Sequence, residues 1–170
     1  MSIKLLACSI FSIVTGTASA ALAQPGPAPE MVKTFDAWGV YSYPSAGASH
    51  CYVLSTPQNA LPAGVDHGSN FFLVAPHPSG AGYYPQAVMG YELRAGSEMR
   101  VSIDNKSFSM MPKGNAGWTK NSSDDVSLID AMKGGRLLSL RAVSRRGTQT
   151  TYTYSLAGIS AALIRASQCK

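Results

Sequence analysis

The chain has 170 residues and carries 14 Lys and Arg against 9 Asp and Glu, which gives a formal net charge of +5. This length is typical of one ordinary domain and argues against several. A domain of that size buries enough surface to fold without a structural metal or a dense set of disulfides.

The N-terminus has the three parts of a secretory signal peptide. Lys4 precedes a short apolar run, and small residues follow as far as Ala23. The apolar run is shorter than the roughly 20 residues that a membrane-spanning helix needs, so a retained anchor is the weaker interpretation. We expect residues 1–23 to be removed on export, with a site three residues earlier as the second choice. Residues 24–33 would then form a flexible leader, and 34–170 a single β-rich domain without a transmembrane span.

Short runs rich in β-branched and aromatic residues, separated by Gly, Pro, Asn and Asp, predict a succession of strands. The run over 71–75 is continuously apolar, as in a strand that is covered on both faces. The expected strands occupy 35–41, 50–55, 71–75, 86–93, 99–103 and 107–111, with surface loops over 57–70 and 76–85.

A first helix is expected over about 123–133, because two acidic residues follow a pair of serines and two glycines follow a lysine. Ser122 or Ser123 would cap its start, since a serine hydroxyl can accept hydrogen bonds from the free N–H groups of the first turn. Val126 would be one of its inner residues.

The C-terminal part of the chain predicts a hairpin followed by a second helix. Strands over 136–144 and 148–154 flank an arginine-arginine-glycine turn, where glycine allows a positive φ. Ser155 would cap a helix over about 156–167, whose apolar residues, Ile164 among them, recur at helical spacing. Many short strands with only two helices favour a mainly β, single-domain antiparallel β-sandwich-like fold.

Two cysteines, Cys51 and Cys169, lie in the expected domain, whereas Cys8 lies in the signal peptide. An even pair in an exported protein predicts one disulfide. Closing so long a loop would contribute on the order of 4–5 kcal/mol on the chain-entropy model. The alternatives are two free thiols or a reactive Cys51 beside His50. Neighbouring residues on a strand point to opposite faces, which argues against such activation.

Charge is unevenly distributed along the chain. Beyond Asp130 there are seven Lys and Arg and no Asp or Glu, which predicts a basic face around the last hairpin and helix. Arg145 and Arg146, at the expected turn tip, are the main candidates for surface contact. Anionic lipopolysaccharide, phospholipid and acidic proteins are the candidate partners, and nucleic acid would be in the wrong compartment. The alternative is a solvated face that only keeps the protein soluble.

Three aromatic residues, Tyr83, Tyr84 and Trp118, lie among Gly, Pro and Asn in expected loops. Exposed aromatic side chains can stack on sugars or anchor a partner protein, so these three are further candidates for surface contact. The alternative is that the loops fold back and bury them.

The common catalytic motifs are missing from the sequence: there is no Gly-x-Ser-x-Gly, no phosphate-binding glycine loop and no His-Glu-x-x-His. We therefore expect no catalytic residues, no cofactor and no metal. The spacing of His50, His67 and His77 matches no metal template, and Asp66 with His67 and His77 is the set that would have to form a metal site. Exposed loop histidines are the expected state.

Several segments of the chain match the pattern of a known family. They are Ser144-Arg145-Arg146-Gly147-Thr148, the run 154–163 that leads to Cys169, Trp38-Gly39-Val40-Tyr41, Cys51-Tyr52 and Gly90-Tyr91-Glu92-Leu93. Together they resemble the invasion-associated locus B proteins, which alphaproteobacteria export. The resemblance covers nearly all of the expected domain, and it implies an exported β-sandwich-type envelope protein linked, in pathogenic members, to host-cell invasion. It implies no established enzymatic activity.

The leading hypothesis is a non-enzymatic protein that acts through surface contacts, in the periplasm or, alternatively, at the outer membrane or cell surface. The second hypothesis is an envelope domain that binds a small molecule or glycan in a pocket between the sheets. The third is a hydrolase with a scattered carboxylate site. A densely packed interior would favour the first hypothesis, and an apolar cavity with inward polar groups the second.

Overall fold

The computed structural model describes residues 28–45, 47–77 and 82–169. The predicted signal peptide over 1–23, with Cys8, therefore lies outside the described residues. The elements in chain order are β1 (Glu30–Phe35), β2 (Trp38–Ser45), β3 (Ala48–Ser55), β4 (Asn59–Leu61), β5 (Phe71–Pro76), β6 (Tyr83–Val88), β7 (Met99–Ile103), β8 (Lys106–Lys113), β9 (Ala116–Trp118), α1 (Ser122–Gly134), β10 (Leu137–Val143), β11 (Gln149–Ser155) and α2 (Ile159–Ser167).

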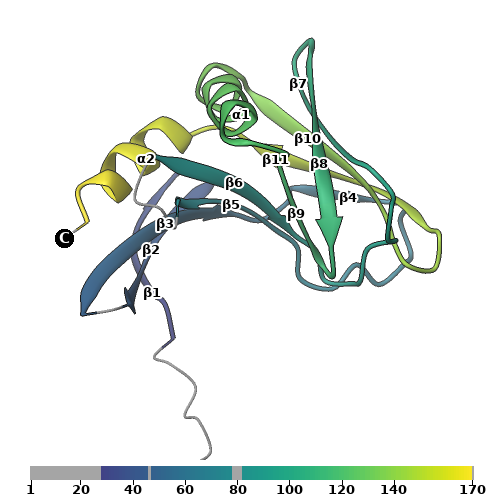
Figure 1. The fold of residues 1–170 in the computed structure, drawn as a ribbon, viewed down its shortest axis with the longest axis horizontal. Helices are drawn as coiled ribbons and strands as arrows, with labels where there is room; N and C mark the ends of the chain where they lie inside the picture. The colour runs from purple at the N-terminus through teal and green to yellow at the C-terminus, as the bar shows by residue number, and fades with distance from the viewer. Residues whose placement is uncertain (1–27, 46, 78–81, 170) are drawn as a thin grey trace, which may run out of the picture.

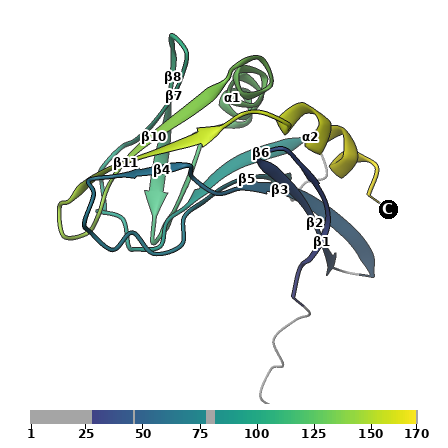
Figure 2. The ribbon, with the colours of Figure 1, turned by 180° about the vertical axis from the view of Figure 1, so that it is seen from behind.

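The strands described form one antiparallel sheet in the order β1-β2-β3-β5-β6-β9-β8-β7-β10-β11-β4. Strand β8 joins its two halves, because the first residues of β8 pair with β7 and the last residues pair with β9. The sheet bends in this region, so that the first half-sheet (β1, β2, β3, β5, β6 and β9) faces the second half-sheet (β8, β7, β10, β11 and β4) (Figures 1 and 2). The predicted mainly β, single-domain antiparallel fold with two helices is confirmed, and its two layers are parts of a single sheet.

Aromatic side chains fill the space between the half-sheets. Trp38 and Phe72 from the first half-sheet and Tyr152 and Tyr154 from the second are all fully buried. The rings of Phe72 and Tyr154 meet edge to face, with centroids 5.8 Å apart. The indole Nε1 of Trp38 donates a hydrogen bond to the carbonyl oxygen of Ser155 at 3.0 Å. These contacts tie strands from the two ends of the chain into one core.

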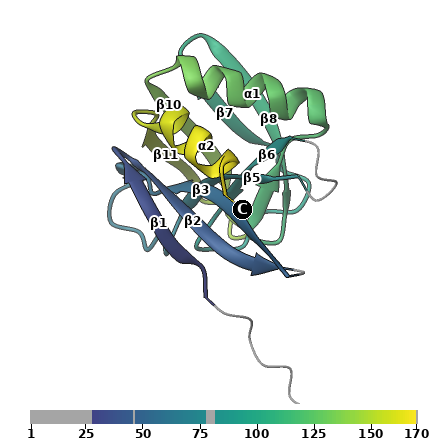
Figure 3. The same cartoon turned by 90° about the vertical axis from the view of Figure 1, so that its left-hand side faces the viewer.

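Helix α1 follows the predicted helix closely but begins at a different cap. The side chain of Asn121 accepts a hydrogen bond from the backbone N–H of Asp124 at 3.0 Å, so the cap is Asn121 and not one of the following serines. The helix buries Leu128 and Met132, whereas Val126, expected inside, is 59% exposed. Both helices lie against the sheet and contact each other (Figure 3).

Helix α2 begins three residues later than predicted, and its N-cap is Gly158. The predicted cap, Ser155, instead accepts a hydrogen bond from the backbone N–H of Ala157 at 3.2 Å, just after β11. Ile159 is buried, whereas Ile164, expected inside, is 62% exposed. None of the helices in the described residues is long and apolar enough to cross a membrane.

The first strand prediction needs correction. The sequence predicts one strand over 35–41, but the chain forms the β1–β2 hairpin there, with a turn at Asp36, whose φ is +47°. The predicted flexible leader over 24–33 is wrong in its last part, because Glu30 to Lys33 belong to β1. A residue at positive φ is usually glycine, but here it is an aspartate. The sequence therefore lacks the glycine that would have indicated a turn.

The predicted loop over 76–85 is also wrong at its end. Strand β6 begins at Tyr83 and ends at Val88, whereas the prediction placed a strand over 86–93. Pro85 pairs with Val74 inside the ladder, a position where proline is rare. The proline therefore argues against a strand in the sequence although one is present. The three-residue strands β4 and β9 were not predicted.

Candidate functional site

The turn between β10 and β11 lies at the end of the molecule opposite α2 (Figure 1). The backbone N–H of Ser144 donates to the carbonyl of Thr148 at 2.9 Å, and the Ser144 hydroxyl accepts from the Thr148 N–H at 3.1 Å. These bonds close the turn and leave Arg145 and Arg146 exposed at its tip. The side chains of both arginines are thus on the surface and are not buried by packing.

The basic residues of the C-terminal part do not form a single face. Arg145 and Arg146 lie at the hairpin end, whereas Arg165 lies on α2 at the other end (Figure 1). The predicted basic face around both hairpin and helix is therefore wrong. The hairpin tip has to be considered as a site of its own.

Arg145 is tied to the neighbouring segment. Its Nη1 lies 2.5 Å from the carboxylate of Glu92, and its backbone N–H donates to the Glu92 carbonyl at 2.7 Å. The two side chains are 74% and 58% exposed, so the ion pair contributes at most about 1 kcal/mol. Arg146 has no ion-pair partner among the described residues and is the freer cation of the two.

A groove of about 450 Å³ lies beside this tip, and we call it the hairpin groove. Three segments that are distant in sequence form it: the loop before β5, the segment after β6, and the β10–β11 hairpin. Its lining residues are 65–68, 90–92, 144–146, Thr148 and Thr150.

His67 connects the groove to the core. Its Nε2 lies 3.0 Å from the carbonyl oxygen of Pro62, which can only accept, so this nitrogen donates. Its Nδ1 lies 2.8 Å from the hydroxyl of Tyr152. His67 is therefore half-buried with both ring nitrogens engaged, and is not the exposed loop histidine that the sequence predicts.

Tyr91 continues this hydrogen-bond network along the groove. Its hydroxyl lies 3.3 Å from the hydroxyl of Tyr152 and 2.6 Å from Oγ1 of Thr150. Thr150 in turn donates to the carbonyl of Ala142 in β10 at 3.3 Å. Side chains from the second half-sheet and from the two loops thus share one polar network.

The buried phenols of Tyr152 and Tyr154 are neutral groups. Burial, and then the hydrogen bond to Tyr91, raise the pKa of the Tyr152 hydroxyl well above its usual value. Burial also raises the pKa of Tyr154, whose hydroxyl has no hydrogen-bond partner among the described residues. These phenols therefore remain protonated at neutral pH and supply donors and acceptors without charge.

Asn70 fixes the geometry of the groove. Its amide nitrogen donates to the carbonyls of His67 at 2.9 Å and Gly68 at 3.1 Å, and its amide oxygen accepts from the N–H of Gly90 at 3.1 Å. The two glycines are in close approach, since a Cβ on Gly90 would lie 2.6 Å from the Gly68 backbone. Only glycine therefore permits this close approach of the two loops that carry His67 and Tyr91.

The chemistry of this arrangement suits recognition. Phenol, threonine and serine hydroxyls line the groove, and guanidinium groups with the Glu92 carboxylate stand at its rim. Such groups orient a polar or anionic surface by hydrogen bonds and charge. His67 is engaged on both sides, so it is poorly placed to activate a nucleophile.

The three aromatic candidates lie in strands. Tyr84 of β6 and Trp118 of β9 line a groove of about 340 Å³ together with His77, whose ring centroid is 6.0 Å from that of Tyr84. Tyr83 packs against the core instead. The structure therefore brings together two of the three, in a groove that shares no lining residue with the hairpin groove.

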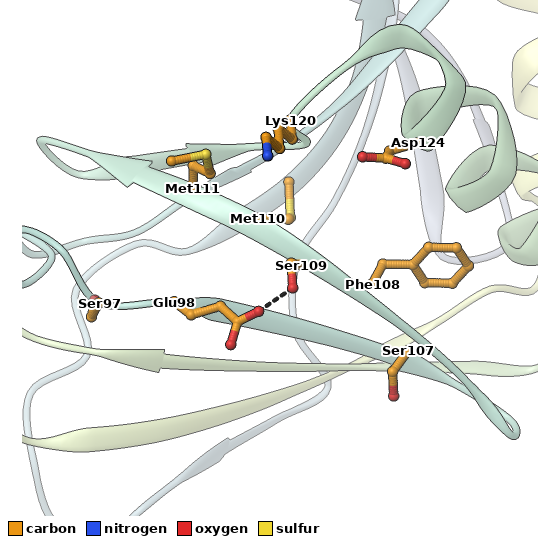
Figure 4. Close-up of a pocket in the computed structure, with 9 residues that line it drawn as sticks. All are labelled: Ser97, Glu98, Ser107, Phe108, Ser109, Met110, Met111, Lys120 and Asp124. Carbon is orange, nitrogen blue, oxygen red and sulfur yellow. Dashed lines mark hydrogen bonds between the residues drawn. The ribbon is translucent and has the colours of Figure 1, made fainter.

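A further groove of about 400 Å³ follows β8, with Met110, Met111 and the start of α1 around it (Figure 4). Glu98 accepts a hydrogen bond from Ser109 there, and its carboxylate lies 3.3 Å from the guanidinium of Arg100. The Ser109 hydrogen bond first, and then Arg100, lower the pKa of Glu98. Because the Glu98 carboxylate is already paired, it is less available to bind an incoming group.

The two cysteines of the domain are joined as a disulfide. Cys51 of β3 and Cys169 beyond α2 have Cα atoms 5.8 Å apart, a normal separation for such a bond. His50 lies on the opposite face of β3, with its ring 5.7 Å from that of Tyr43. The bond fastens the end of α2 to the first half-sheet.

The residues considered for a metal are used otherwise. The side chain of Asp66 accepts a hydrogen bond from the N–H of Gly68 at 2.9 Å, within its own loop. In the described part of the chain, no group of three His, Cys, Asp or Glu side chains is placed to hold a metal ion.

The fold has a solved counterpart. The crystal structure of invasion associated protein b from Bartonella henselae matches with a TM-score of 0.57 and 14% sequence identity, over 82% of this chain and 95% of that chain. At this identity the likeness shows a shared fold alone, and it is the fold that the sequence resemblance implies. No protein-family model matches the chain, and no curated protein matches it at a significant level.

Proposed function

We propose that this protein is a non-enzymatic, invasion-associated locus B-like protein of the bacterial cell envelope, which acts by binding a partner through its surface. The hairpin groove is the contact site, with Arg145 and Arg146 reaching toward an anionic partner. No cofactor and no metal take part.

One observation carries this proposal. Two arginines stand exposed at a turn that is closed by hydrogen bonds, directly beside a groove whose floor is a network of hydroxyl groups. Exposed charge on a well-ordered turn serves recognition better than stability. A partner with phosphate or carboxylate groups, such as lipopolysaccharide, acidic phospholipid or an acidic protein, would pair with the guanidinium groups while its polar parts enter the groove.

The packed interior supports binding at the surface over binding in a pocket between the sheets. Trp38, Phe72, Tyr152 and Tyr154 occupy the space between the half-sheets and are fully buried. A ligand between the halves would have to displace these side chains, at a cost of several kcal/mol each.

Export is supported by two independent features. The chain begins with the features of a signal peptide, and its two domain cysteines are paired, which is common only in oxidising compartments. The fold shared with the Bartonella protein agrees with an envelope role. The periplasm, with the outer membrane or cell surface as alternatives, is the proposed location.

The test compares two double variants that remove the same charge. Arg145→Ala with Arg146→Ala should reduce co-sedimentation of the oxidised protein with isolated outer membranes several-fold at low salt. Arg136→Ala with Arg165→Ala, at the opposite end, should leave it unchanged. An equal loss in both variants would mean that only net charge matters and would refute a site at the hairpin.

A further inference from the structure

One long stretch of the chain is almost free of charge. From residue 37 to residue 91, Asp66 is the only Asp, Glu, Lys or Arg. This stretch supplies β2, β3, β5 and β6, so four adjacent strands of the first half-sheet carry no ionised side chain apart from any histidinium. In a protein of net charge +5 such a surface needs an explanation.

The outer face of these strands is aromatic. Side chains alternate along a strand, so Val40 and Val53 are fully buried in the core while Tyr41 and Tyr52 lie on the other face, half-buried. The register places Tyr41 opposite Tyr52, Tyr43 opposite His50 and Ala75 opposite Tyr84. We call this surface the aromatic face; its rings are Tyr41, Tyr43, His50, Tyr52 and Tyr84.

The rings support one another. Tyr41 and Tyr52 stack with centroids 5.5 Å apart and planes inclined by 18°, and Tyr43 lies 5.9 Å from Tyr52. Burial, followed by the neighbouring Tyr41 and Tyr43, raises the pKa of Tyr52, and burial with Tyr43 raises that of Tyr84. The rings thus form one cluster, in which the hydroxyls of Tyr52 and Tyr84 stay neutral at neutral pH.

Gly39 adapts the sheet to this cluster. A Cβ at this position would lie 2.7 Å from Cε2 of Tyr41, so the tyrosine ring leans over the strand only because the glycine lacks a side chain. The face also ends in a hollow: Tyr84 lines the groove of about 340 Å³ that contains Trp118 and His77. Rings and groove form one continuous surface.

We infer that the aromatic face binds a neutral polysaccharide, with the groove at Tyr84 and Trp118 as one end of the site. A charged polymer would gain no ion pair across these strands and would lose hydration of its own charges. A neutral sugar chain can pack its C–H faces on the rings and exchange hydrogen bonds with the tyrosine hydroxyls. Lys120 and Asp125 line the groove at one end of the site, but β2, β3, β5 and β6 themselves carry no Lys, Arg, Asp or Glu, so a neutral chain is the occupant that suits these strands. A second copy of the chain is the competing occupant.

This surface is distinct from the hairpin groove, and the two can be tested separately. The oxidised protein is titrated by calorimetry with three neutral probes: maltohexaose, cellohexaose and hexa-N-acetylchitohexaose. Saturable binding of at least one probe is expected. Tyr43→Ala with Tyr84→Ala should weaken it at least tenfold, and Tyr84→Phe, which keeps the ring, by about threefold. Arg145→Ala with Arg146→Ala, the control, should bind like the wild type.

Several results would overturn the inference. They are no saturable binding of any of the three probes, unchanged binding by the double tyrosine variant, or tighter binding of polygalacturonate, an anionic probe. A dimer that the same tyrosine variant dissociates would assign the face to a second copy instead. If the alanine variant does not fold, the near-ultraviolet tyrosine difference spectrum of the wild type decides: saccharide should change it, and an unchanged spectrum would contradict the inference.

Discussion

The hydroxyl of Tyr91 lies 2.6 Å from Oγ1 of Thr150, a residue 59 positions later in the chain. This bond connects the segment after β6 to β11 and forms part of the floor of the hairpin groove. Through Tyr152 it is continuous with His67. The groove is therefore a product of tertiary structure, and substitutions at these residues test the contacts that hold it together.

Loss of the hydroxyl should change the stability of the protein in opposite directions at Tyr152 and at Tyr154. Tyr152→Phe removes a group bonded to His67 and Tyr91 and should destabilise the protein by about 1–3 kcal/mol. Tyr154→Phe removes a buried hydroxyl without a partner among the described residues and should stabilise it by about 1 kcal/mol. Urea unfolding measures both, and a change of the same sign in the two variants would contradict this assignment.

Stability should fall at alkaline pH. The pKa values of Tyr152 and Tyr154 are raised in the folded state, so above about pH 10 the unfolded chain loses these protons while the folded chain keeps them. The unfolded state is then favoured as pH rises. Below about pH 10 the two residues do not contribute to the dependence of the free energy of unfolding on pH. Thermal midpoints between pH 8 and 11.5 should decline less steeply in the variant with both tyrosines replaced by Phe. Parallel curves would show that these phenols do not titrate as described.

Removing the Cys51–Cys169 bond should destabilise the domain strongly. The two residues are 118 positions apart, and a loop of this size gives on the order of 4–5 kcal/mol on the chain-entropy model. Urea unfolding of the Cys51→Ser, Cys169→Ser variant should show a loss of that order. The wild type under reducing conditions should match the variant, and a loss below about 1 kcal/mol would mean that the bond is structurally unimportant.

The start of α1 offers a matched pair of substitutions. Asn121→Ala removes the side chain that accepts from the Asp124 N–H and should cost about 1 kcal/mol. Ser122→Ala, one residue later, should change the free energy of unfolding by less than about 0.5 kcal/mol. A larger effect of Ser122→Ala than of Asn121→Ala would mean that Ser122 is the N-cap, as the sequence pattern suggests.

Local sequence signals predict a helix or strand correctly where several of them agree. Helix α1 was predicted within one residue at each end, because Asp124, Asp125 and Lys133 complement the helix dipole and glycines follow. The start of α2 was missed since Ser155 looks like a cap but belongs to β11. The β1–β2 hairpin was missed because Asp36 makes its turn without glycine.

The site was predictable only in part. Arg145 and Arg146 could be placed at a turn tip from the sequence, since Gly147 marks the turn. His67 and Tyr91 could not be assigned, because their roles depend on the Asn70 bridge and the glycine contact that join two loops. Long-range contacts of this kind leave no periodic signal in the sequence.

The hairpin groove is the proposed place at which the exported protein meets its partner. A photo-crosslinking amino acid at position 146, introduced in intact cells and compared with one at position 165 on α2, tests it most directly. We predict a discrete crosslinked adduct from position 146 that disappears when residues 1–23 are deleted, and none from position 165. Adducts from position 165 alone, or adducts from position 146 that persist without the N-terminal segment, would contradict the account.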